Sequence, residues 1–296
     1  MGAVYKREMK AYISNVYGFL FIAALLFVPG VLVFILNLNY GLADMTYAFL
    51  YEGYTSFVLI LMIPLLCMRI MAEDKRNKTD LFYLSLPLRT STVVLGKYLA
   101  LLTVLAVPTL ILALYPIILS VFGNMNFLRT YSTLLMYFLM GAAFLAVCMF
   151  LSSLTKHMAL AALYGVLAGV ALYFLPPLAN LLPYTALASL LGLYLLALVL
   201  TVISWFATKN LTVVAIVAAV GILPLTLFYI LDAFVFHWEA FPGLFPLIVD
   251  SVSPFCQFER VVMDGNFDLF AVSTMISTAV FFVYLTVRSA DNRRLA

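Results

Sequence analysis

"YGFLFIAALLFVPGVLVFIL", which runs from Tyr17 to Leu36, decides the fold of this chain. It contains no charged residue, and about twenty apolar residues are what an α-helix needs to cross the hydrocarbon core of a bilayer. The bilayer offers the backbone no hydrogen-bonding partners, so the run is expected to be helical. It is longer than the apolar region of a typical signal peptide, and no small-residue cleavage site precedes the next polar stretch, so we expect it to be retained.

The composition extends this conclusion to the whole chain. Of 296 residues, 66% are hydrophobic and 10% are charged, whereas a water-soluble domain has about 25% charged residues. The sequence therefore predicts an all-α fold, a polytopic transmembrane helical bundle formed by residues 1–296 as a single transmembrane domain. We expect about eight spans, six plus an extra pair, at residues 17–38, 55–71, 98–122, 131–153, 158–175, 184–206, 212–231 and 269–287.

Prolines and glycines mark details within these spans. The third span is interrupted by Tyr115-Pro116, and the prolines of "PPLANLLP" favour a tight turn between the fifth and sixth spans. A re-entrant hairpin over residues 158–206 is the alternative to two spans there. "GVLAG", with Gly165 and Gly169, fits close helix packing, which we expect within the chain before packing between chains.

The basic residues orient the chain. With the amino terminus in the cytoplasm, only Arg129 and Arg260 of the 16 Lys and Arg residues lie outside. Cytoplasmic loops carry the excess of Lys and Arg, so both termini are expected in the cytoplasm. The residues expected inside are Lys6, Arg7, Lys10, Arg69, Lys75, Arg76, Lys78, Arg89, Lys97, Lys156, Lys209, Arg288, Arg293 and Arg294.

Two polar segments suggest contact with the membrane surface. Residues 1–16 carry Tyr5, Met9, Tyr12 and Ile13 at helical spacing with basic residues on other faces, which predicts an amphipathic interfacial helix. The alternative is a basic flank that only orients the first span. The extracytoplasmic loop 232–268 is rich in aromatic residues and prolines, and is either an interfacial segment or an ordinary connection.

The sequence offers no constellation for catalysis, metal binding or cofactor binding. "LGKY" at Gly96 is no P-loop, and His157 and His237 are expected on opposite sides of the membrane. Arg69, Lys97 and Asp232 are expected at span ends, where they can reach the interface. An ion-coupled carrier normally holds a carboxylate within a span, so the lack of one counts against that class.

The densest charge lies in "EDKRNKTDLFYLSLPLRTSTVVLGKY", Glu73 to Tyr98. We expect a cytoplasmic continuation of the second span that stops near Pro87, followed by a second short element over 89–94. Apolar side chains in the cytosol usually mark a docking site for a soluble partner. Leu81, Leu84, Leu86 and Leu88 fit this pattern; a re-entrant turn that rests on the membrane is the alternative.

This segment resembles the cytoplasmic signature of type-2 ABC transporter permeases, roughly "E-E-R-x-x-G-T-x-E-x-L-L-x-x-P". The glycine of that pattern is Lys78 here and its second glutamate is Asp80. "VYKREMKAYISNVYGFLFIA" and "SVSPFCQFERVVMDGNFDLFAVSTMISTAVFFVYLTVRSADNRR" are similar to the two ends of the gliding-motility-type branch. Two additional spans in 158–231 depart from the six that are usual in the family.

The resemblance implies a division of labour between subunits. Two cytoplasmic ABC ATPase subunits would bind ATP and Mg, and a second permease copy or a homologous permease would complete the dimer; this chain would hold no cofactor and bind no nucleic acid. Residues 72–97 would be the coupling loop that contacts the ATPase. The residues implied in this coupling are Glu73, Asp74, Arg76, Thr79, Asp80, Leu81, Leu84, Leu86, Pro87, Arg89 and Thr90.

The expected function is that of the membrane-spanning subunit of an ATP-driven exporter in the bacterial cytoplasmic membrane, in contact with its lipid. Nearly uncharged spans suit an amphipathic, lipid-like or peptide substrate, as in exporters that confer drug or peptide resistance. The alternative is an ATP-independent secondary carrier or a polytopic membrane enzyme.

Overall fold

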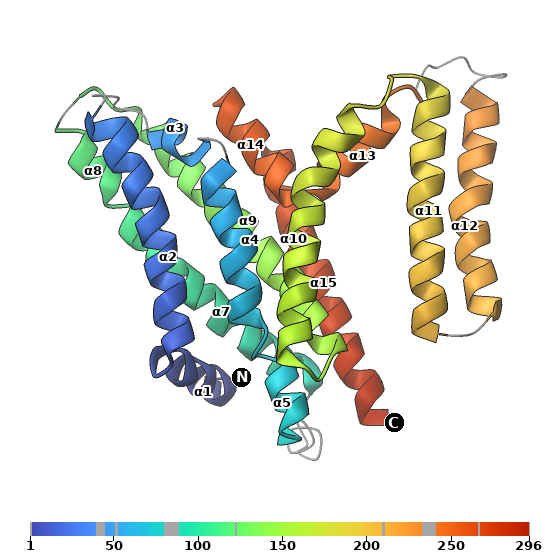
Figure 1. Ribbon diagram of the computed structural model, residues 1–296, viewed down its shortest axis with the longest axis horizontal. Coiled ribbons are helices and arrows are strands. Elements are labelled where there is room, and N and C mark those ends of the chain that lie inside the picture. Colours follow the sequence, from blue (N-terminus) through green and yellow to red (C-terminus); the bar gives the residue numbers. More distant parts are fainter. Residues whose placement is uncertain are drawn as a thin grey trace. The chain divides into compact units, whose positions relative to one another are not determined.

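The computed structural model describes residues 2–39, 45–50, 53–79, 89–121, 123–208, 211–232, 241–265 and 267–295, and this part is helical without strands (Figure 1). The helices are α1 (Gly2–Ile13), α2 (Val16–Leu32), the π-helix η1 (Val33–Asn39), α3 (Met45–Leu50), α4 (Tyr54–Cys67), α5 (Ala72–Arg76), α7 (Thr90–Leu112), α8 (Tyr115–Leu119), α9 (Phe127–Leu154), α10 (Met158–Asn180), α11 (Ala186–Thr208), α12 (Leu211–Leu231), α13 (Leu244–Val252), α14 (Pro254–Asp264) and α15 (Leu269–Leu295).

Six of the described helical segments are long and apolar enough to cross a membrane. They are Val16–Asn39, Tyr54–Arg76, Thr90–Leu119, Phe127–Leu154, Met158–Asn180 and Leu269–Asp291. The two other predicted spans correspond to α11 and α12, which contain the shorter apolar segments Ala186–Leu198 and Ala218–Leu231. The predicted polytopic helical bundle is therefore confirmed.

The chain forms two compact units. The first consists of Met1–Leu172 and Pro254–Ala296, and the second of Tyr173–Ser253. The division falls inside α10, four residues before Pro176 and Pro177. A proline has no N–H to donate to the carbonyl four residues earlier, so the helical ladder is weakened where the units divide.

The first unit is built around α9. In its most apolar stretch of 18 residues, 72% of the residues are buried. The helix packs against α4, α7, α14 and α15. Its small residues allow close approach: a Cβ on Gly141 would lie 2.8 Å from Leu105 of α7. Phe144 packs edge-on against Phe255 of α14, with ring centroids 5.4 Å apart. A helix that is apolar on all faces is stable only when other helices cover it, which explains its central place.

The second unit has its own small core. Ala179, Leu193, Phe241, Phe245 and Val249 are buried together. Gly192 of α11 gives room to the ring of Phe245, because a Cβ there would lie 2.6 Å from it.

Asp232 follows directly after α12, at the span end where it was predicted. Its residue is 6% exposed, and one carboxylate oxygen accepts a hydrogen bond from the Phe241 amide at 3.2 Å. Its contact with the membrane surface stays a prediction.

Several local predictions can be compared with the helices. Close packing of Gly165 and Gly169 within the chain is confirmed, because a Cβ on Gly165 would lie 2.8 Å from Pro64 and one on Gly169 would lie 2.7 Å from Phe144. The predicted turn between the fifth and sixth spans is confirmed, but it begins after Asn180, since α10 continues past Pro176. A membrane helix tolerates proline when neighbouring groups satisfy the freed carbonyls. The break before Pro116 is confirmed by the separate helix α8.

The predicted extracytoplasmic loop is largely helical where it is described. α13 and α14 cover Leu244–Val252 and Pro254–Asp264. On α14 the residues Phe255, Phe258 and Val261 are buried, so this helix completes the core of the first unit. Contact of residues 232–268 with the outer membrane surface stays a prediction.

Candidate functional site

One end of the first unit holds a network of charged residues. In Figure 1 both ends of the chain lie at this end, together with α1 and α5. The first turns of α7, the last turn of α9 and the first turn of α10 also contribute to it, as the contacts below show.

α5 is a five-residue helix held in place by its partners. A helix this short is not stable alone. Its first amide, on Ala72, donates to the hydroxyl of Ser152 at 3.2 Å. The amine of Lys75 donates to the carbonyl of Ser153, near the end of α9, where the last carbonyls lack partners within the helix. α5 is therefore fixed to the end of α9.

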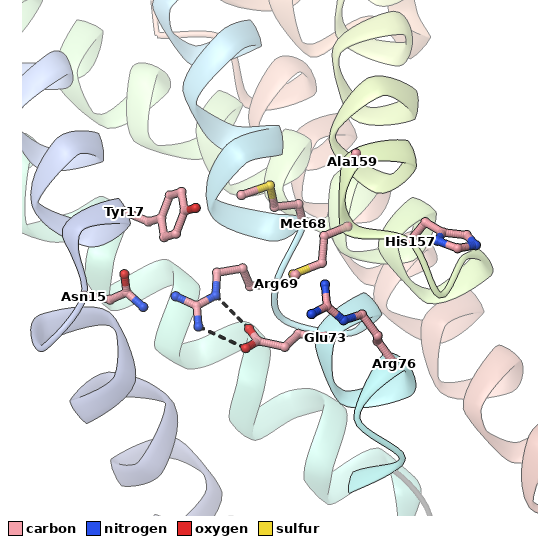
Figure 2. A pocket seen from close by; sticks show the side chains of 9 residues that line it. Asn15, Tyr17, Met68, Arg69, Glu73, Arg76, His157 and Ala159 are labelled. Carbon is pink, nitrogen blue, oxygen red and sulfur yellow. Dashed lines mark hydrogen bonds and ion pairs between the residues drawn. The ribbon is translucent and has the colours of Figure 1, made fainter.

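Arg69 and Glu73 connect α5 to the preceding turn. The guanidinium donates two hydrogen bonds to the carboxylate, at 2.7 and 3.1 Å, as the dashed lines in Figure 2 show. The same guanidinium lies over the ring of Tyr17, 5.3 Å from its centroid. Planar, two-point pairing and stacking on an aromatic face are typical of arginine, and together they fix the start of α5 next to α2.

A buried ion pair joins α5 to α7. Lys97 is 2% exposed, and its amine donates to the carboxylate of Asp74 and to the carbonyl of Ile70. The expectation that Lys97 reaches the interface from a span end is wrong. α7 begins at Thr90, so Lys97 lies two turns inside the helix, and α5 supplies the counter-charge that allows its burial.

Asp74 is also the contact point for two further groups. Its second carboxylate oxygen accepts a hydrogen bond from Thr79 at 2.8 Å, and the guanidinium of Arg7 on α1 lies 3.6 Å away. Arg7 also pairs with Glu8 at 2.5 Å. Burial lowers the pKa of Arg7, but the hydrogen bond and charge of Glu8, with the charge of Asp74, raise it above the ordinary value. The guanidinium thus stays charged at physiological pH.

α1 is packed through a different line of residues from the one predicted. Val4, Glu8 and Tyr12 are its buried residues, and the hydroxyl of Tyr12 donates to the carbonyl of Leu66 at 3.3 Å. Of the predicted stripe, Tyr5 bonds Thr103 of α7 at 3.1 Å, and Ile13 is 61% exposed. The buried line is turned toward Glu8 because Arg7 neutralises that carboxylate.

An apolar cavity of about 180 Å³ lies between α1, α2 and α7. Met9, Tyr12 and Ile13 line it from α1, opposite Phe19, Ile22, Val104 and Val107. The contact of α1 with a membrane surface stays a prediction.

The predicted coupling residues are found in three situations. Glu73, Asp74 and Thr79 belong to the network around α5, and Thr90 donates to Asp291 of α15. Arg76 and Arg89 are exposed. Asp80, Leu81, Leu84, Leu86 and Pro87 lie outside the described residues, so their docking role stays a prediction.

The boundaries of the segment differ from the predicted ones. The second span does not continue unbroken into it, because a turn at 68–71 separates α4 from α5. The predicted short element over 89–94 is instead the start of α7. α7 runs without a break from Thr90 to Leu112 and accommodates Pro108. The charge of Lys97 is neutralised by Asp74.

Sequence analysis missed the partners of the segment. Arg7, Lys97, Ser152, Ser153 and Asp291 are all brought to it by the fold. Lys97 could have been singled out as a candidate for a buried ion pair, because it is a lone charge after the apolar "TVVLG". The other four residues show no such pattern in the sequence. Within the described ranges no three His, Cys, Asp or Glu side chains gather as metal ligands. The arrangement joins α1, α5, α7, α9 and α15 through charged and polar contacts.

Comparison with known proteins gives one result that bears on this arrangement. A family model described as "ABC-2 family transporter protein" matches residues 34–176, a little under half of the chain, including the whole charged segment. No curated protein and no solved structure matches the chain. Such family members are membrane subunits that work with an ATPase subunit. With six apolar helices long enough to span a bilayer, the chain is a multi-pass membrane protein, and the match supports a permease subunit of the ABC-2 type.

Proposed function

We propose that this chain is the membrane-spanning subunit of an ATP-driven exporter, and that residues 72–97 pass motion from a separate ATPase to the membrane helices. The observation that carries the proposal is the position of Asp74. This carboxylate contacts Lys97 of α7, Arg7 of α1 and Thr79 of its own segment, while Lys75 beside it holds the end of α9.

These contacts make α5 a mechanical junction. Charge-assisted hydrogen bonds in a buried environment are short and strong, so their partners move together. A push on the segment after α5 would reach α1, α7 and α9 at once. The contact between Thr90 and Asp291, and that between the hydroxyls of Ser153 and Ser289 at 3.2 Å, extend the junction to α15.

The partners follow from the same proposal. Two cytoplasmic ABC ATPase subunits would supply ATP and Mg, and a second permease, identical or homologous, would complete the complex. The similarity of both chain ends to the gliding-motility-type branch supports that branch. We place the complex in a bacterial cytoplasmic membrane with both termini in the cytoplasm, which agrees with the common end of the first unit at which they lie (Figure 1).

We infer an amphipathic, lipid-like or peptide substrate. The ion pairs of Arg7 with Glu8 and Asp74, of Arg69 with Glu73 and of Lys97 with Asp74 lie at one end of the first unit. The middle of these spans thus offers chiefly apolar surface, which suits a molecule with a large apolar part better than a small ion.

Co-purification with the ATPase tests the proposal. The leucines of the segment after α5 are the expected docking residues, so the triple variant Leu84→Asp, Leu86→Asp, Leu88→Asp should lose the ATPase that the wild-type chain retains. Its matched control is Val121→Asp with Leu128→Asp, two side chains that are 81% and 84% exposed. Leu128 lies at the start of α9, about 38 Å along the helix from Ser153, which holds Lys75 of α5. Retention of the ATPase by the triple variant, or equal loss in the control, would contradict the docking assignment.

A further inference from the structure

A pocket of about 600 Å³ opens beside α5, and Asp74 is not among its lining residues. It is lined by Asn15, Tyr17, Met68, Arg69, Glu73, Arg76, His157, Met158 and Ala159 (Figure 2). These residues come from the start of α2, the turn before α5, α5 itself and the start of α10, all within the first unit.

The position of the pocket places it at the edge of the hydrocarbon region. α2 begins at Val16, α4 ends at Cys67 and α10 begins at Met158, so three apolar helices meet the polar boundary around it. Tyr17 and Ala159 are exposed at its two sides. A tyrosine is favoured at this depth because its ring is apolar and its hydroxyl is polar. Lipid head groups lie at the same level.

The charge of the pocket favours an anion. Its charged lining residues are two arginines and one glutamate, which leaves one positive charge with His157 neutral. Glu73 already receives both hydrogen bonds of Arg69, so its charge is neutralised locally. The guanidinium that remains is that of Arg76.

The donors for such an anion are available. Arg76 is exposed, and in the described part its side chain forms no hydrogen bond or ion pair, nor do those of Asn15 and His157. Asn15 precedes α2 but its amide does not cap that helix. Arginine binds phosphate through two parallel N–H groups, and basic pockets between membrane helices bind anionic head groups.

We propose that this pocket binds a phosphate group, and that its source is the head group of an anionic phospholipid in the leaflet at this end of the helices. Arg76 is the primary ligand, and Arg69 is held against Tyr17 and Glu73 so that its charge supports the site. The lipid would contact α2, α5 and α10 together. The proposal does not depend on an ATPase partner.

Binding of short-chain lipids to the purified full-length chain tests it, without any ATPase present. Dioctanoyl phosphatidylglycerol should bind, and Arg76→Gln should weaken this binding about tenfold or more, because a charge-assisted hydrogen bond is lost. The control is Lys156→Gln, which removes one exposed charge next to His157 but outside the lining. It should bind as the wild type does. Equal thermal stability of both variants without lipid excludes misfolding.

Two further ligands distinguish a lipid head group from a free phosphate ion as the bound group. Dioctanoyl phosphatidylcholine and inorganic phosphate should both bind more weakly than the anionic lipid. Inorganic phosphate that binds as tightly as the lipid, with loss in Arg76→Gln, would assign the site to a free ion and overturn the lipid assignment. Unchanged lipid binding in Arg76→Gln, or an equal fall in Lys156→Gln, would overturn the site itself.

Discussion

At the scale of single residues, Lys78 links sequence to backbone. The type-2 ABC permease pattern has a glycine at this position, and the chain departs from it. Yet Lys78 has a φ of 57°, in the left-handed region that glycine favours. It follows Asn77, the residue after α5, which is where a helix commonly ends with a left-handed glycine. The backbone of this chain at Lys78 thus has the conformation that a glycine would favour.

Lys78→Gly is therefore expected to stabilise the protein. A left-handed conformation costs a residue with a Cβ about 1–2 kcal/mol, part of which is offset by the greater freedom of glycine in the unfolded chain. We expect the free energy of unfolding in detergent to rise by about 0.5–1 kcal/mol. Asn77→Gly is the matched control, because Asn77 has a φ of −83° and gains nothing from glycine. A rise in both variants, or a fall in Lys78→Gly, would refute this explanation.

Lys97 shows where reasoning from sequence stops at this scale. A lone lysine near the start of an apolar run predicts a side chain that reaches the interface. Its burial depends on Asp74, 23 residues earlier, and on the carbonyl of Ile70. The turn at 68–71 and the position of α5 bring these residues together. A repeating pattern in the sequence therefore does not reveal the pairing. Pairings of this kind are set by tertiary structure.

At the scale of elements, the ion pair between α5 and α7 leads to a prediction. Asp74→Ala leaves the buried amine of Lys97 without its counter-charge, which should cost about 3 kcal/mol of unfolding free energy. In the double variant Asp74→Ala, Lys97→Met, the charge is removed as well, and most of the loss should be recovered. Chemical unfolding of the purified variants measures both. A double variant as unstable as the single one would show that the pair does not hold α5 in place.

The helices themselves were largely predictable, whereas their ends were not. The run from Tyr17 to Leu36 has no alternative to a helix in a bilayer, and it is found in α2 and η1. Pro176 misled the prediction, since proline ends helices in water more reliably than in membranes. α7 begins earlier than hydropathy suggested because Lys97 is neutralised rather than exposed.

At the scale of the whole molecule, the two units differ in the elements that they contain. The first contains the matched family region up to Leu172, the charged junction and both chain ends. The second contains α11 and α12, the predicted extra pair, with a core of its own around Phe241. The sequence predicted this extra pair from hydropathy. It could not predict where the units separate, because that depends on which helices share a core.

We propose that energy from ATP enters the membrane helices through the segment beginning at α5. ATP hydrolysis by the partner ATPase, measured alone and with the chain reconstituted in bilayers, tests it most directly. We predict that the wild-type chain changes the hydrolysis rate several-fold, and that the triple variant Leu84→Asp, Leu86→Asp, Leu88→Asp removes the change. A rate that is the same with and without the chain, or a change that persists in the triple variant, would contradict the claim.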